Sequence, residues 1–270
     1  MSAALARLRA FLAAASGVAL VEVREAKGST PREAGAWMLV SPGGIFGTIG
    51  GGQLEFMAID RAREMIAAGT PATDLIDIPL GPEIGQCCGG RVVVDIALAD
   101  EALRAAIPQR IEREEAARPA AFIFGGGHVG HALADALSLL PLAVTVVETR
   151  ADQIRALPEG VEARVIAVPE AVVREAPAGA AFLVLTHDHA LDFLIVAEAL
   201  RRPDAAYVGM IGSKTKRATF ASWYLKEAGG EEAKLARLVC PIGGADVKDK
   251  RPSVIAALAA AEVMRALSGA

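Results

Sequence analysis

The strongest constraint on the fold is a glycine-rich turn that follows an apolar segment in the middle of the chain. The sequence FGGGHVG over residues 124–130 has the spacing G-x-G-x-x-G, formed by Gly125, Gly127 and Gly130. In nucleotide-binding α/β folds the first glycine makes a tight turn, the second lets a pyrophosphate approach the backbone, and the third lets the helix pack on the strand. The spacing therefore predicts a strand over 120–124 and a helix whose N-terminus stabilises an anion.

The rest of the second half alternates strand patterns with helical patterns. We expect further strands over 143–148, 163–168, 181–186 and 206–212, and helices over 131–140, 192–200, 215–229 and from residue 252 onward. Alternation of this kind predicts a parallel sheet with helices on both faces. The fold expected for residues 119–270 is therefore α/β, a Rossmann-like doubly wound parallel sheet domain.

Glu148 ends the strand that follows the glycine turn, and it lies roughly 20 residues along the chain, the usual place of a ribose-binding acid. An acidic side chain there can accept hydrogen bonds from a ribose hydroxyl, whereas the nearby Arg150 would attract a phosphate. The alternative is that the glycines serve only the packing of strand on helix and that no nucleotide binds.

Several polar residues are expected at the carboxyl edge of this sheet, where open α/β sheets bind ligands. Three are histidines: His128, His187 and His189. With Asp188 and Asp192 they suggest a metal, but no clean tetrahedral set is visible, and an aspartate that caps the next helix is an equally good interpretation. The segment GMIGSKTKR over 209–217 either grips a phosphate through its cations or solvates the start of a helix.

The first half has a different pattern. We expect an amphipathic helix within 1–20, strands over 17–26, 74–80 and 91–98, a hairpin over 37–50, and a helix over 54–69. Residues 100–119 are rich in Ala, Arg and Glu, contain two prolines, and separate the two patterns. These features predict an N-terminal α+β domain over 1–118, with its boundary near Arg118.

Two loops of the first half are too rich in special residues for ordinary connections. The segment KGSTPREAG over 27–35 carries Ser29, Thr30 and Arg32, and GTIGGGQLE over 47–55 carries the three glycines 50–52 before Glu55. Amides of such a glycine turn can point at an anionic ligand. In the alternative interpretation, Gly50, Gly51 and Gly52 form a tight turn and Glu55 caps a helix.

A third loop, GQCCGGR over 85–91, contains the adjacent Cys87 and Cys88. Neighbouring cysteines rarely bond to each other because the geometry is strained, so a soft-metal or nucleophilic role has to be considered. Arg91 and exposed glycine amides would lower the pKa of a thiol there. The alternative is a pair of small buried apolar residues.

Charge and composition exclude several classes of function. The formal net charge is -4 and the pI is near 5.7, so the chain has no sustained basic field for nucleic acid. No run of about 18 uncharged apolar residues is present, which argues against a membrane span. The N-terminal stretch does not have the pattern of an export signal, and the three cysteines then predict a reducing, cytoplasmic location.

Taken together, the motifs resemble those of the XdhC/CoxI family, in its xanthine dehydrogenase accessory branch. They occur in the expected order over nearly the whole chain: KGSTPREAGAWMLVSPGGIFGTIGGGQLE, CCGGR, FIFGGGHVG, THDHALD, MIGSKTKR and CPIGG. The resemblance implies a chaperone that binds and protects molybdenum cofactor, assists its sulfuration with a cysteine desulfurase, and inserts it into a xanthine dehydrogenase-type apoenzyme. It also implies a homodimer.

The resemblance carries over to positions in all three loops of the first half: Ser29, Thr30, Arg32, Gly50, Gly51, Gly52, Glu55, Cys88 and Gly89. On this hypothesis the pterin lies in an interdomain cleft, Arg32 and glycine amides engage its phosphate, and the Cys88 thiol lies near the molybdenum, because soft thiolate suits that metal. A nucleotide is the second expected ligand, at the Rossmann-like domain. Relatives commonly have Asp-Pro-Arg where this chain has Glu148-Thr149-Arg150, which leaves the identity of that nucleotide open.

Two other functions fit parts of the sequence. An NAD(P)-dependent oxidoreductase is suggested by FGGGHVG and Glu148 in a fitting strand-turn-helix context. A pure interaction module with a vestigial nucleotide fold is suggested by the lack of an acid-base pair with obvious catalytic spacing. Binding measurements discriminate the three hypotheses: a chaperone binds the molybdenum cofactor, an oxidoreductase binds a nucleotide, and an interaction module binds only a partner enzyme.

Overall fold

The computed structural model describes residues 2–70, 72–81 and 89–269. The chain divides into two compact units, Met1–Arg113 and Glu114–Ala270. The division falls a few residues before position 118, where the change of sequence pattern places it. None of the helices in the described part of the chain is long and apolar enough to span a lipid bilayer.

The first unit is built on a five-stranded antiparallel sheet with the order β3-β2-β1-β5-β4. Its elements are α1 (Ala3–Ala14), β1 (Ala19–Lys27), β2 (Trp37–Val40), β3 (Ile45–Gly47), α2 (Gly52–Ala68), β4 (Thr73–Pro79), β5 (Arg91–Leu98) and α3 (Glu101–Ala116). Alternate residues of the central strands β1 and β5 are buried, as expected for a sheet with one apolar face. The predicted hairpin is confirmed as β2 and β3.

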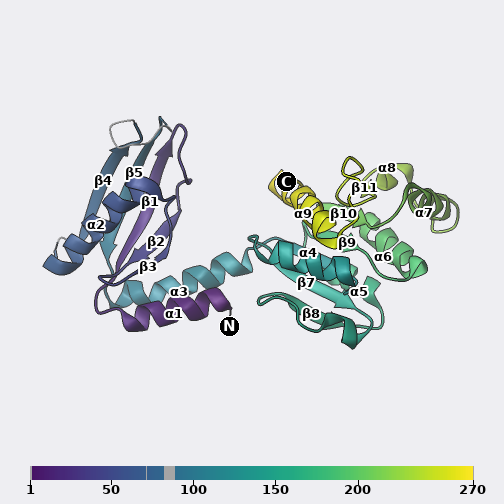
Figure 1. Ribbon diagram of the computed structural model, residues 1–270, viewed down its shortest axis with the longest axis horizontal. Helices are drawn as coiled ribbons and strands as arrows, with labels where there is room; N and C mark the ends of the chain where they lie inside the picture. The colour runs from purple at the N-terminus through teal and green to yellow at the C-terminus, as the bar shows by residue number, and fades with distance from the viewer. Residues whose placement is uncertain (1, 71, 82–88, 270) are drawn as a thin grey trace. The chain divides into compact units, whose positions relative to one another are not determined.

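Helices cover this sheet through two separate apolar clusters. Leu54, Ala58 and Met65 of α2 pack on the buried side chains of β1 and β5. Helices α1 and α3 form the other cluster around Leu8 and Leu39, and they run close together in Figure 1. The guanidinium of Arg104 adds to this pair, because it donates to the carbonyls of Leu12 and Ala15 at the end of α1.

The segment 100–119, expected to separate the halves, is for the most part the helix α3. Its Ala, Glu and Arg residues are strong helix formers, and Ile107 and Ile111 become buried against α1. Pro108 lies inside the helix and removes one backbone hydrogen-bond donor. The helix propensity of α3 and the burial of its isoleucines together outweigh the cost of the proline. The residue pattern alone did not indicate this helix.

The second unit confirms the predicted Rossmann-like fold. Its six-stranded sheet is parallel throughout, with the order β11-β10-β9-β6-β7-β8. The strands are β6 (Ala120–Phe124), β7 (Ala143–Glu148), β8 (Glu162–Val165), β9 (Ala181–Val184), β10 (Tyr207–Met210) and β11 (Leu238–Val239). The chain winds outward from β6 to β8 and then returns to β9 on the other side of β6, so the topological switch point lies between β6 and β9.

Helices lie on both faces of this sheet, as Figure 1 shows. They are α4 (His128–Ser138), α5 (Pro169–Glu175), α6 (His189–Arg201), α7 (Lys214–Lys226), α8 (Glu232–Leu235) and α9 (Pro252–Ser268), with the 3-10 turn η2 (Ala151–Ile154). One core joins α4 and α9 to the sheet, and the other joins α5, α6 and α7 to the opposite face. The short elements η2, α5, α8 and β11 were not predicted from the sequence.

Candidate functional site

The glycine turn between β6 and α4 is shaped by two close backbone contacts. Gly125 has a φ of +119°, and an added Cβ would lie 2.5 Å from the carbonyl oxygen of Leu185 at the end of β9. A Cβ on Gly130 would lie 2.0 Å from the carbonyl oxygen of Gly125. Neither position has room for a side chain, so these two glycines are needed for the packing of the turn itself.

Gly127 differs from the other two glycines of the motif. It is the N-cap residue of α4, its φ is -74°, and a Cβ placed on it would meet no atom within 4 Å. The space beside it is therefore open, as expected where a ligand approaches the backbone. His128, the first residue of α4, is exposed next to it.

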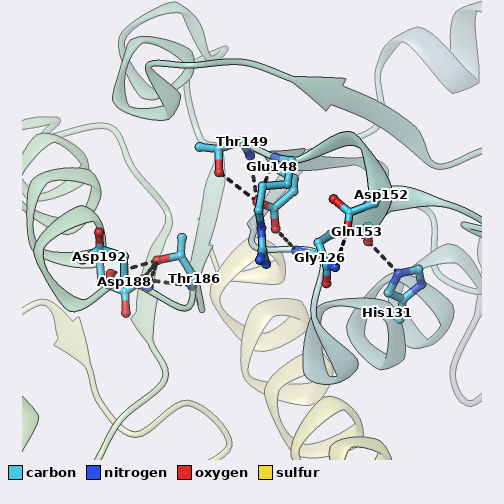
Figure 2. Close-up of polar contacts among 10 residues, drawn as sticks. Gly126, His131, Glu148, Thr149, Asp152, Gln153, Thr186, Asp188 and Asp192 are labelled. Carbon is cyan, nitrogen blue, oxygen red and sulfur yellow. Dashed lines mark hydrogen bonds and ion pairs between the residues drawn. The ribbon is translucent and has the colours of Figure 1, made fainter.

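The carboxylate of Glu148 is hydrogen-bonded within its own turn. Its Oε2 accepts from the amide of Gly126 at 2.9 Å, and its Oε1 accepts from the amides of Thr149 at 2.8 Å and Arg150 at 3.2 Å. Figure 2 shows the carboxylate between these groups, and only 5% of the residue is exposed. Burial alone would raise the pKa of Glu148, but the hydrogen bonds outweigh it and hold that pKa below its ordinary value.

The segment after β7 folds back over the same turn. A Cβ on Gly126 would lie 2.5 Å from the carbonyl oxygen of Gln153, and that oxygen lies 2.9 Å from Nε2 of His131 on α4 (Figure 2). Between η2 and α4 lies a hollow of about 410 Å³. Its lining includes Gly127, His128, Asp135 and Asp152.

The histidine-rich segment at the end of β9 is organised by two aspartates. Asp188 caps α6, because its Oδ1 accepts from the amide of Ala190 at 2.8 Å. Asp192 is fully buried and accepts from the Thr186 amide at 2.9 Å. His187 and His189 are exposed, and the described residues contain no cluster of three His, Cys, Asp or Glu side chains that could hold a metal ion. The helix-capping interpretation therefore holds for Asp188.

Lys216, one of the cations of the GMIGSKTKR segment, forms a buried ion pair with Asp192. The Lys216 side chain is 9% exposed and its Nζ contacts Oδ2 of Asp192. The pair links α7 to α6 beneath the carboxyl edge of the sheet. Because its charge is already neutralised, Lys216 serves the packing of two helices, whereas Lys214 and Arg217 form no ion pair with any described residue.

In the first unit, the three unusual loops meet through glycines. A Cβ on Gly50 would lie 2.6 Å from Cβ of Pro31 and 3.2 Å from Cγ of Arg32. A Cβ on Gly90 would lie 2.2 Å from the carbonyl oxygen of Ser29. The loop over 27–35 therefore packs against Gly50 near Pro31 and against Gly90 near Ser29.

The glycine turn of this unit is already occupied by a carboxylate of the chain. Oε2 of Glu55 accepts from the amides of Ile49 at 3.0 Å and Gly51 at 3.1 Å, and from the Thr48 hydroxyl at 2.5 Å. Gly50, Gly51 and Gly52 all have positive φ, at 123°, 74° and 65°. The turn is thus an anion-binding backbone arrangement in which Glu55 supplies the anion. The amides of Ile49 and Gly51 are not presented to a ligand.

The exposed groups of this loop cluster are on the 27–35 segment. Arg32 and Ser29 are exposed and Thr30 is half-buried. Among the described residues nothing forms an ion pair or a side-chain hydrogen bond with Arg32. Gly89 is exposed as well, and its amide donates to the Leu80 carbonyl at 2.9 Å.

Of the cysteine segment over 85–91, the structure describes Gly89, Gly90 and Arg91. Cys87 and Cys88 lie outside the described residues. Arg91, which the sequence suggested as an activator of a thiol, makes a two-pronged ion pair with Asp77 on the neighbouring strand, at 2.7 and 2.6 Å. That pair raises the pKa of Arg91 and lowers that of Asp77.

One buried polar contact was not suggested by any sequence motif. The Tyr207 hydroxyl donates to Oε2 of Glu262 at 2.7 Å, and the Gly243 amide donates to the same oxygen at 2.9 Å. Burial, together with this hydrogen bond, raises the pKa of Tyr207 strongly. The contact fixes α9 and the loop after β11 to the sheet, and a Tyr in a strand and a Glu far along the chain give no local signal of it.

The fold and these glycine-bearing segments define a class of protein: an antiparallel α+β unit carrying three glycine-bearing loops, followed by a Rossmann-type unit with a dinucleotide-type turn. Family models agree with this description. The model for the XdhC Rossmann domain matches residues 121–263, and the model for the XdhC and CoxI family matches residues 11–78. The chain belongs to the XdhC and CoxI family.

Individual relatives are distant. The curated Escherichia coli K12 protein YqeB, described as uncharacterized, is 25% identical over 268 residues, which cover 93% of this chain and 44% of YqeB. The chain therefore spans less than half the length of that relative. A crystal structure described as a xanthine dehydrogenase from Bacillus halodurans has a TM-score of 0.79 with 19% identity, covering 100% of this chain and 96% of the other. At that identity the likeness establishes the shared fold.

Proposed function

We propose that this chain is an accessory protein that holds and protects molybdenum cofactor, assists its sulfuration with a cysteine desulfurase, and delivers it to a xanthine dehydrogenase-type apoenzyme. Membership of the XdhC and CoxI family supports an accessory role. On the family resemblance alone, we extend the proposal to a homodimer that works in the cytoplasm.

The observation that carries the proposal is the convergence of the three loops of the first unit. Gly50 packs against Pro31 and Gly90 against Ser29 of the 27–35 segment, and neither glycine has room for a Cβ. Such close backbone packing positions Ser29 and Arg32 on a rigid base. Rigid support of a few exposed polar groups is the usual design of a ligand site.

The exposed groups suit the anionic end of a phosphorylated pterin. Arg32 is a cation without a partner among the described residues, and a guanidinium binds phosphate oxygens with two parallel hydrogen bonds. The Ser29 hydroxyl can donate beside it. Since Glu55 takes up the amides of Ile49 and Gly51, we assign the phosphate to Arg32 and the 29–30 hydroxyls rather than to those amides.

Cys88 belongs to the proposal on the strength of the sequence. It directly precedes Gly89 in the sequence, and the next residue, Gly90, contacts Ser29. A thiolate is a soft ligand that suits molybdenum or a sulfur donor. We propose that Cys88, rather than Cys87, engages the metal end of the cofactor.

Cofactor retention by the purified full chain tests this assignment. The Arg32→Ala variant should bind the cofactor about tenfold more weakly, since one charge-assisted phosphate contact is lost. Arg7→Ala on α1 is the matched control, because Arg7 is also exposed and without a described partner. Unchanged retention in both Arg32→Ala and Cys88→Ala would remove these residues from the site.

The alternative is an NAD(P)-dependent oxidoreductase. The open position beside Gly127 supports nucleotide binding at the second unit. The hydrogen bonding of Glu148 within its own turn speaks against the usual ribose contact. Nicotinamide reduction followed by absorbance, with and without candidate substrates, distinguishes this alternative from an accessory role.

A further inference from the structure

Two hollows flank the loop that follows β11 and carries the CPIGG motif. Pro241 and Ala245 line both of them. The first, of about 490 Å³, is lined also by Lys214, Arg217 and Cys240. The second, of about 400 Å³, is mostly apolar, with walls from Ile211, Ile242, Val247 and Ile255. A basic hollow therefore adjoins an apolar one, with a shared wall.

The cations that line these hollows are unpaired among the residues that the structure describes. Lys214 and Arg217 line the first hollow, Lys248 and Lys250 line the second, and none of the four forms an ion pair with a described residue. The acids of the loop are Asp249, which pairs with Arg251 at 2.5 Å, and the exposed Asp246. In a chain of net charge -4, a local excess of unpaired cations beside a hollow favours an anionic ligand.

The Cys240 thiol adds no negative charge to the first hollow that would repel an anion. Burial raises the pKa of its thiol above the ordinary value, although Lys216 and Arg217 act in the other direction. The thiol is therefore neutral near pH 7 and contributes a small apolar wall to the basic hollow.

The position of the hollows in the fold differs from that of the glycine turn. Lys214 follows the carboxyl end of β10, and Cys240 directly follows β11. In the sheet β11 is three places from β6, which at about 4.8 Å per strand is roughly 14 Å from the turn after β6. The hollows therefore lie at the carboxyl edge of the sheet, the edge at which open α/β sheets bind ligands, but away from the topological switch point between β6 and β9.

We propose that these paired hollows form a second anion site, which binds a planar nitrogen heterocycle carrying a phosphate, with the phosphate at Lys214 and Arg217 and the ring against Ile242 and Ile255. Apolar walls stack a flat ring, and unpaired cations bind its phosphate. A nucleotide and a phosphorylated pterin share this chemistry. The site is independent of the loop cluster assigned above to the first unit.

Calorimetric titration of the full chain in an Arg32→Ala background, at 0.15 M salt, tests the proposal with ADP and with the pterin cofactor released from a molybdenum enzyme, because this background weakens the site proposed in the first unit. Lys214→Gln and Arg217→Gln should each weaken binding by about tenfold or more. Lys226→Gln is the matched control: it removes the same charge from the same helix, but Lys226 lies at the far end of α7 and is not among the residues lining either hollow. It should leave binding unchanged.

A Gly127→Asp variant separates this site from the glycine turn. Aspartate is well suited to the N-cap of α4, and a Cβ at this position would meet no atom within 4 Å, so we expect the fold to be kept while a carboxylate is placed where a pyrophosphate would lie. Binding that survives Gly127→Asp and is lost in Lys214→Gln supports the proposal, and the tighter of the two probes identifies the ligand. Absence of binding by both probes, or loss only in Gly127→Asp, overturns it.

Discussion

The carboxylate of Glu148 accepts a 2.9 Å hydrogen bond from the amide of Gly126, 22 residues earlier in the chain, and so ties the end of β7 to the glycine turn after β6. The acid expected at a ribose is thereby part of the turn itself. Substitution of a group that supports a loop lowers the free energy of unfolding, whereas substitution of a group that only binds a ligand lowers the affinity for that ligand. The unfolding free energy of the second unit can be measured separately from that of the first. The chain has two tryptophans, so Trp223 reports on that unit in a Trp37→Phe background.

Glu148→Ala should lower the unfolding free energy of the second unit by about 2–3 kcal/mol, because buried amide donors lose their acceptor. Glu148→Gln keeps one oxygen and should cost less. Urea unfolding followed by Trp223 fluorescence measures both. A loss below about 0.5 kcal/mol in Glu148→Ala, the range of ordinary surface changes, would show that the carboxylate does not hold the turn.

The same carboxylate predicts a dependence of stability on pH. Its folded pKa lies below the ordinary value of 4.5, so its contribution is fully present above that pH and is lost as the pH falls toward the folded pKa. The wild-type second unit should therefore lose more stability than Glu148→Gln when the pH is lowered from 5 to about 3. Parallel slopes for the two proteins over that interval would contradict the assignment.

Gly90→Ala should destabilise the first unit by about 2 kcal/mol, because the new Cβ would lie 2.2 Å from the Ser29 carbonyl oxygen. Gly43→Ala is the matched control, since a Cβ added to Gly43 would meet no atom within 4 Å and its φ is not positive. Thermal unfolding followed by Trp37 fluorescence in a Trp223→Phe background compares them. Equal melting temperatures for the two variants would mean that the 27–35 segment is not held by Gly90.

Lys216→Met should cost about 3–5 kcal/mol in the second unit, because it leaves the fully buried Asp192 carboxylate without its cation. The double variant Asp192→Asn with Lys216→Met should recover much of that loss, since no unpaired buried charge remains. Trp223 fluorescence in urea gives all three values. Additive losses in the double variant would exclude a direct interaction between the two side chains.

Short sequence patterns predicted those elements whose formation depends on residues close together in the chain. The turn over 124–130 and the alternation around it depend on neighbouring residues, and both the strand β6 and the helix α4 follow from them. The helix α3 was taken for a separator because Pro108 and Pro119 are strong breakers in isolation. The burial of Ile107 and Ile111 that stabilises it comes from α1, about a hundred residues away, and no short window contains that information.

The candidate sites show the same limit. The sequence placed Glu148 at the right point of the fold, but the direction of its side chain depends on the fold of 149–153 over Gly126. It also indicated Gly50–Gly52 as an anion-binding turn, and which anion fills it, Glu55 of the chain itself, depends on side-chain geometry. Gly90 and Ser29 lie just beyond the paired ends of β5 and β1, and only the folded sheet brings them into contact.

The proposed function requires that the loop cluster of the first unit carries cofactor for delivery. A transfer assay tests this requirement: the full chain is loaded with molybdenum cofactor, a xanthine dehydrogenase-type apoenzyme is added, and the appearance of its activity is followed against the concentration of the loaded chain. We expect activation by the wild type and by Arg7→Ala, and activation that requires about tenfold more Arg32→Ala. Activation by Arg32→Ala at wild-type concentrations, or no activation by the wild type, would contradict the proposed function.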